Sequence, residues 1–140
     1  MAHNKKQLER LLRVRTLQLG MTRADEARAH DRRANEADLA ERIARLADGV
    51  APAPVGGNGF ALVAAAHFRS RLQQSAEMSE ARLRDAELAA ERAAEATREA
   101  RRDQSAIEKL MARADADAVL KAIRALESAP PTRKIRHDPC

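Results

Sequence analysis

The clearest pattern in the chain is a seven-residue repeat of uncharged positions in its second half. From Leu72 to Ala118, the positions reached by alternating steps of four and three residues are all uncharged, although 34% of all residues in the chain are charged. The repeat consists of Leu72, Ala76, Ser79, Leu83, Ala86, Ala90, Ala93, Thr97, Ala100, Gln104, Ile107, Met111, Ala114 and Ala118. Charged residues occupy the flanking positions, as on the solvated face of a coiled-coil helix. The pattern predicts a long helix that packs against another helix.

Helix-breaking residues divide the chain into two helical segments. Prolines and glycines cluster between residues 49 and 59, and two further prolines stand at 130–131. We therefore expect helices over residues 5–48 and 60–127, a loop over 49–59 and a flexible basic tail over 129–140.

The loop is short relative to the helices that it joins. Gly49 is expected to end the first helix in a left-handed conformation, and Asn58 to cap the second. A short connection makes consecutive helices antiparallel neighbours. The expected fold is all-α, with two long helices in an antiparallel coiled-coil hairpin and a longer second helix.

The first segment has a less regular apolar pattern. Its middle is rich in alanine with charge on every side, so its packing should bury little apolar area per residue. The apolar positions are Leu8, Leu11, Leu12, Leu17, Leu19, Met21, Ala24, Ala27, Ala34, Ala37, Leu39, Ala40, Ile43 and Leu46.

The two helices differ in length, by about 66 Å against about 100 Å at 1.5 Å per residue. Folding them about a tight loop would place residue 5 opposite residue 103 and leave residues 104–127 uncovered. This predicted overhang is the most aliphatic part of the second helix and carries Ile107, Leu110, Met111, Val119, Leu120, Ile123 and Leu126. Exposed apolar stripes indicate an interaction surface. Partner binding, self-association and fraying are the three interpretations.

The charge and composition of the chain argue against several classes of fold and function. The net charge of +5 is concentrated at the two ends, since residues 1–23 carry six cations and one acid. Aromatic residues make up only 1% of the chain, which argues against a β-sandwich and against an enzyme pocket lined with aromatic groups. Binding to nucleic acid through the basic ends has no aromatic platform or known motif to support it.

Few residues of the chain are candidates for metal binding, disulfide formation or catalysis. The four histidines are scattered and the only cysteine is Cys140, so we expect no metal site, no disulfide and no cofactor. No carboxylate pair or phosphate-binding motif supports catalysis. Phe60 and Phe68 could either fill the tip of the hairpin or present an apolar patch to a partner. A charged start without an apolar run predicts a cytoplasmic protein with no membrane insertion.

Three features together resemble the FliJ/YscO family, the small stalk proteins of flagellar and type III secretion export. They are the basic helix with the segment from Leu8 to Arg15, the Pro/Gly loop near residue 55, and the later segment from Ala106 to Leu110. The likeness covers residues 5–127.

The resemblance implies a non-enzymatic coiled-coil stalk at the cytoplasmic face of the inner membrane. Its open end would enter the pore of the hexameric export ATPase, and its side would contact the export gate protein and export chaperones. By match, the partner-binding positions are Leu8, Leu11, Leu12, Arg15, Glu108, Lys109 and Leu110. The overhang adds Ile107, Met111, Leu120, Ile123 and Leu126.

Overall fold

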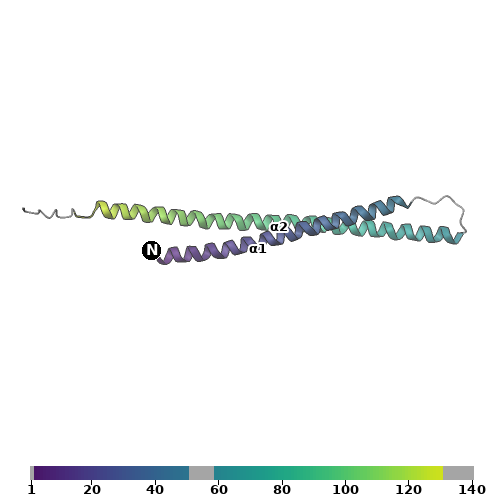
Figure 1. Cartoon of the computed structure of the whole chain (residues 1–140), viewed down its shortest axis with the longest axis horizontal. Helices are drawn as coiled ribbons and strands as arrows, with labels where there is room; N and C mark the ends of the chain where they lie inside the picture. The colour runs from purple at the N-terminus through teal and green to yellow at the C-terminus, as the bar shows by residue number, and fades with distance from the viewer. Residues whose placement is uncertain (1, 51–58, 131–140) are drawn as a thin grey trace, which may run out of the picture.

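The computed structural model describes residues 2–50 and 59–130, which form two long helices and no strand (Figure 1). Helix α1 spans Ala2–Gly49 and helix α2 spans Gly59–Glu127, with 48 and 69 residues. Each terminus lies within three residues of the position expected from the sequence. The expected left-handed conformation of Gly49 is wrong, because Gly49 is the last residue of α1 and no described glycine has a positive φ. Asn58 lies outside the described residues.

Ion pairs between the helices show that they run antiparallel. Lys5 pairs with Asp115 at 2.8 Å, Arg15 with Asp103 at 2.9 Å, and Arg82 with Glu36 at 3.8 Å. In each pair the two residue numbers add up to between 118 and 120, so the register is constant along the rod. We call the end with residues 2 and 127 the open end, and the other the loop end.

This register corrects the predicted overhang. Residue 5 lies opposite residue 115 and not residue 103, so α2 extends past α1 by only about ten residues at the open end, roughly 15 Å. A similar length of α2 extends past α1 at the loop end (Figure 1). Ile107 and Met111, which were expected to be uncovered, are half-buried.

The observed register exchanges one set of apolar contacts for another. It half-buries Ile107 and Met111 near the open end, and it leaves Phe60, Val63 and Phe68 exposed at the loop end. Doubling a loop costs only about 0.6 kcal/mol in closure entropy, so a short loop does not by itself hold the two helix ends opposite each other.

The predicted repeat of α2 forms its packing face. Every position of this repeat from Leu72 to Ala114 is buried or half-buried, and only Ala118, near the end of α1, is exposed. Ser79, Ala86 and Ala90 are among the most buried residues of the molecule. The buried Ser79 hydroxyl donates to the Ala76 carbonyl at 2.9 Å, so its polar group is satisfied within its own helix.

Helix α1 carries the same seven-residue repeat, although the sequence did not reveal it. The positions on this repeat are Leu8, Leu12, Arg15, Leu19, Thr22, Glu26, Ala29, Arg33, Glu36, Ala40, Ile43, Ala47 and Val50, and all but Arg33 are buried or half-buried. Charged and hydroxyl side chains hold several of them, which hides the pattern from a search for apolar residues. The small side chains of the α2 repeat leave room for the stems of these longer residues.

Candidate interaction surfaces

The predicted partner-binding residues divide into an interior group and an exposed group. Leu8 and Leu12 of α1, and Ile107 and Met111 of α2, are half-buried between the helices. They lie within the interval that the Lys5–Asp115 and Arg15–Asp103 pairs enclose. These four residues hold the open end of the rod together and offer little surface to a partner.

Arg15 also belongs to the contact between the helices. Its guanidinium pairs with Asp103 of α2 at 2.9 Å and donates a hydrogen bond to Gln18 Oε1 at 3.0 Å. Between the residues that directly follow Arg15 and Asp103 in the chain, the Gln104 amide donates to Thr16 Oγ1 at 3.2 Å. Arg15 therefore helps to fix the register, while its side chain keeps 40% of its surface exposed.

The exposed group surrounds the same stretch of the rod. Leu11 on α1 and Leu110 on α2 each keep 47% of their surface, and Glu108 and Lys109 are also exposed. These four side chains, unlike the interior group, are available to a partner.

The last turns of α2 form the most apolar exposed surface at the open end. Val119, Leu120, Ile123 and Leu126 keep between 45% and 76% of their surface. Only Lys121, Arg124 and Glu127 add charge to this segment. The overhang is thus shorter than the sequence suggested, but its aliphatic character remains.

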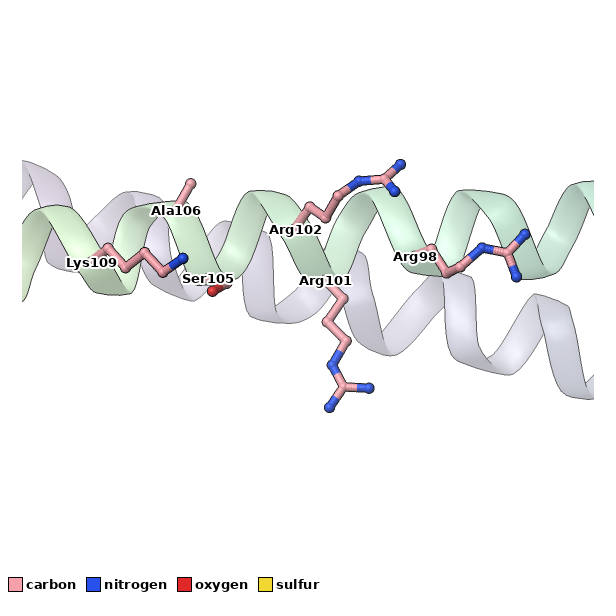
Figure 2. A pocket seen from close by; sticks show the side chains of 6 residues that line it. All are labelled: Arg98, Arg101, Arg102, Ser105, Ala106 and Lys109. Atoms are coloured by element: carbon pink, nitrogen blue, oxygen red, sulfur yellow. The ribbon is translucent and has the colours of Figure 1, made fainter.

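Of a cationic surface on α2, only Lys109 is among the residues expected from the sequence to bind a partner. Arg98, Arg101, Arg102, Ser105, Ala106 and Lys109 line a shallow depression of about 560 Å³ on this helix. Figure 2 shows these side chains along α2, with α1 passing behind it in this view. The spacing of three and four residues between the cations was the available signal.

Glu95 anchors one end of this surface. Its carboxylate accepts from Arg98 at 2.6 Å and from Arg102 at 3.1 Å. The hydrogen bond from Arg98, followed by that from Arg102, lowers the pKa of Glu95 below its usual 4.5. Glu99 also stands 4.0 Å from Arg102, so two carboxylates pair with the four cations of this surface, which keeps a net positive charge.

Two further apolar surfaces lie elsewhere on the rod. Val14, Leu17 and Met21 of α1 are at least half exposed. At the loop end, Phe60 keeps 82% and Phe68 keeps 55% of its surface. Of the two interpretations of these aromatic residues, the structure favours an exposed patch over a filled tip.

The described residues contain no group of three His, Cys, Asp or Glu side chains that could hold a metal ion. Among the same residues, neither helix offers a stretch long and apolar enough to cross a membrane.

Comparisons with known proteins leave the family open. No family model, no curated protein and no solved structure matches this chain. The exposed surfaces of the rod and the resemblance seen in the sequence are therefore the features that point to a function.

Proposed function

We propose that this protein is a non-enzymatic, two-helix coiled-coil stalk of a flagellar or type III export apparatus, acting in the cytoplasm. Its open end would bind the hexameric export ATPase, and its side would assist contacts with the export gate protein and export chaperones. The observation that carries the proposal is the aliphatic end of α2, which extends beyond α1 and stays exposed from Val119 to Leu126.

The geometry fits a stalk because one helix is left free to enter a ring. A rod of two packed helices is stiff, and about 15 Å of single helix at its end is narrow enough for a pore. The packing faces of the two helices are made mostly of small and aliphatic side chains, and Ser79, Ala86 and Ala90 are among the most buried. Binding through surfaces is the activity that such a molecule supports.

The exposed side chains towards the open end are those we propose to touch the ATPase. They include Leu120, Ile123 and Leu126 at the end of α2, and Leu11 and Leu110 further along the rod. We assign the contact to these side chains and to Glu108 and Lys109. Leu8, Leu12, Arg15, Ile107 and Met111 would act indirectly, by holding the two helices in register.

A triple variant, Leu120→Ser, Ile123→Ser and Leu126→Ser, tests the proposal against a candidate export ATPase in a pull-down and an ATPase assay. The variant should lose binding and stimulation while its circular dichroism stays helical. The control replaces Met78, Leu88 and Leu39 by serine, because these residues are also exposed but lie far from the open end. Wild-type binding by the first variant, or equal loss in both, contradicts the proposal.

Self-association is the second candidate, favoured by the same exposed aliphatic end. Two copies could cover this surface by pairing the ends of their α2 helices. Sedimentation equilibrium separates the candidates, because a stable oligomer that the triple variant dissociates would assign the surface to a second copy. A monomer over the micromolar range favours the stalk.

A further inference from the structure

Helix α2 carries a second seven-residue repeat on a face that α1 does not cover. Steps of four and three residues lead from Arg98 to Leu126. Ser105 is half-buried and all the other positions are exposed. We call this set the outer stripe, and it consists of Arg98, Arg102, Ser105, Lys109, Ala112, Ala116, Val119, Ile123 and Leu126.

The outer stripe is distinct from the packing face of α2. Over the same length, α1 covers Ala100, Gln104, Ile107 and Met111, which are all half-buried. Neighbouring positions of the two repeats differ by one, two or five residues, each of which is more than a quarter turn around the helix. Figure 2 shows Arg98, Arg102 and Lys109 on α2 with α1 behind it.

The two halves of the outer stripe differ in chemistry. The first half is cationic, because Arg98, Arg102 and Lys109 lie on it and Arg101 lies beside it. Within the described residues, two of these four cations form ion pairs. Arg98 pairs with Glu95, and Arg102 pairs with both Glu95 and Glu99. The second half, from Ala112 to Leu126, contains only alanine and aliphatic side chains on the repeat.

A seven-residue repeat on a helix surface is the pattern that receives one more helix along its length. The distance from residue 98 to residue 126 is about 42 Å, enough for a partner helix of about 28 residues. Such a helix would bury its apolar positions against Val119, Ile123 and Leu126. It would need acidic side chains to meet the cationic half.

A second copy of this chain does not supply such a helix. In a parallel pair, Arg98, Arg102 and Lys109 would face the same cations of the other copy. In an antiparallel pair over the whole stripe, they would face aliphatic residues. Only the short segment 112–126 could pair with itself, and that would leave the cationic half without a partner.

We propose that the outer stripe binds one helix of another protein, whose residues are acidic along one half and aliphatic along the other. This inference deepens the proposed function and rests on it for the class of partner, a helical protein met at the open end of the rod. Charge complementarity with the cationic half selects the acidic partner, and the aliphatic half supplies the apolar contact area.

Two labelled synthetic peptides of 28 residues serve as probes, measured by fluorescence anisotropy at low salt. Both carry a seven-residue repeat with glutamate in one half and leucine in the other. One has glutamate in its first half, for parallel binding, and the other in its second half, for antiparallel binding. The full chain should bind one of them, and binding should weaken as salt rises.

The variant Arg98→Glu, Arg102→Glu, Lys109→Glu should bind that peptide at least tenfold more weakly. A peptide with lysine in place of glutamate should restore the affinity of this variant. The matched control reverses three cations off the stripe, Arg69, Arg71 and Arg92, and should bind as the wild type does. Circular dichroism confirms that each variant stays helical.

Failure to bind either peptide, or equal binding by the wild type and the reversed variant, overturns the inference. A dimer in sedimentation that the reversed variant strengthens also overturns it, because the stripe would then belong to a second copy. The candidate export ATPase separates the two proposals. Peptide binding without ATPase binding contradicts only the proposed function, whereas ATPase binding that charge reversal leaves unchanged contradicts only the outer stripe.

Discussion

Lys5, in the second turn of α1, donates a hydrogen bond to Asp115 Oδ1 of α2 at 2.8 Å. This contact joins residues 110 positions apart and marks where the two helices last meet before α2 continues alone. The hydrogen bond to Asp115 raises the pKa of Lys5 above its usual 10.5. The Lys5–Asp115 contact therefore contributes to stability below pH 10.5, and this contribution is lost as the pH rises through the raised pKa of Lys5.

Leu19 is the only large apolar side chain among the described residues that is nearly fully buried, with 4% of its surface exposed. Leu19→Ala should lower the free energy of unfolding by about 2–4 kcal/mol, because it removes buried surface and leaves a cavity. Leu17→Ala is the matched control, since Leu17 keeps 69% of its surface, and should change the value by less than about 0.5 kcal/mol. Chemical denaturation measures both. Equal effects would place the packing face elsewhere on α1.

Glu36 lies on the packing repeat of α1 with only 20% of its side chain exposed. Its Oε2 atom is buried without a hydrogen-bond partner, and Arg82 stands 3.8 Å away. Glu36→Leu should raise the free energy of unfolding by about 1 kcal/mol, because an unsatisfied carboxylate is replaced by an apolar contact. Glu41→Leu, at an exposed position, provides the control. A loss of stability in the first variant would mean that the ion pair with Arg82 outweighs the burial penalty.

Gly20 lies in the interior of α1, and a Cβ atom placed on it would meet no atom within 4 Å. Gly20→Ala should stabilise the protein by up to about 1 kcal/mol, because alanine loses less backbone entropy in a helix. The midpoint of thermal unfolding should rise accordingly. Gly59→Ala, in the first turn of α2, should have a smaller effect since helix ends fray. An unchanged or lower midpoint for Gly20→Ala would show that this glycine serves a bend.

The pKa of Glu95 provides a test of the cationic surface. NMR titration of its side chain should give a pKa below 4.5 in the wild type, because Arg98 and Arg102 both donate to it. Since this pKa is lowered by folding, the contribution to stability is present above pH 4.5 and is lost as the pH falls through the lowered pKa. Arg98→Ala should move the pKa back towards 4.5 more than Arg102→Ala does. The reverse order would contradict the assigned geometry.

The sequence was sufficient to predict the two helices and the packing face of α2. The repeat from Leu72 to Ala114 is visible because each of its members is uncharged. The packing face of α1 was not visible, because Arg15, Glu26, Arg33 and Glu36 occupy it. Small residues on one helix can accept long charged stems from the other, and no pattern within one helix reveals that complementarity.

The register of α1 on α2 could not be predicted from the sequence. The position where the exposed end of α2 begins therefore could not be predicted either. Loop length was taken to set the register, which placed Ile107 and Met111 in the overhang. Loop closure depends only weakly on length, so a short loop does not by itself fix the register. The free end of α2 therefore begins near residue 118, and five of the predicted partner-binding residues turn out to lie in the contact between the helices.

Disulfide crosslinking tests most directly whether α2 extends past α1 from residue 118. In a Cys140→Ser background, the pair Leu12→Cys and Ile107→Cys should form a crosslink under mild oxidation, because both side chains lie between the helices at the same level. The pair Leu12→Cys and Ala96→Cys, which corresponds to the tight-loop register, should remain reduced. Efficient crosslinking of the second pair and not the first would contradict the account, since it would return Ile107 and Met111 to the overhang.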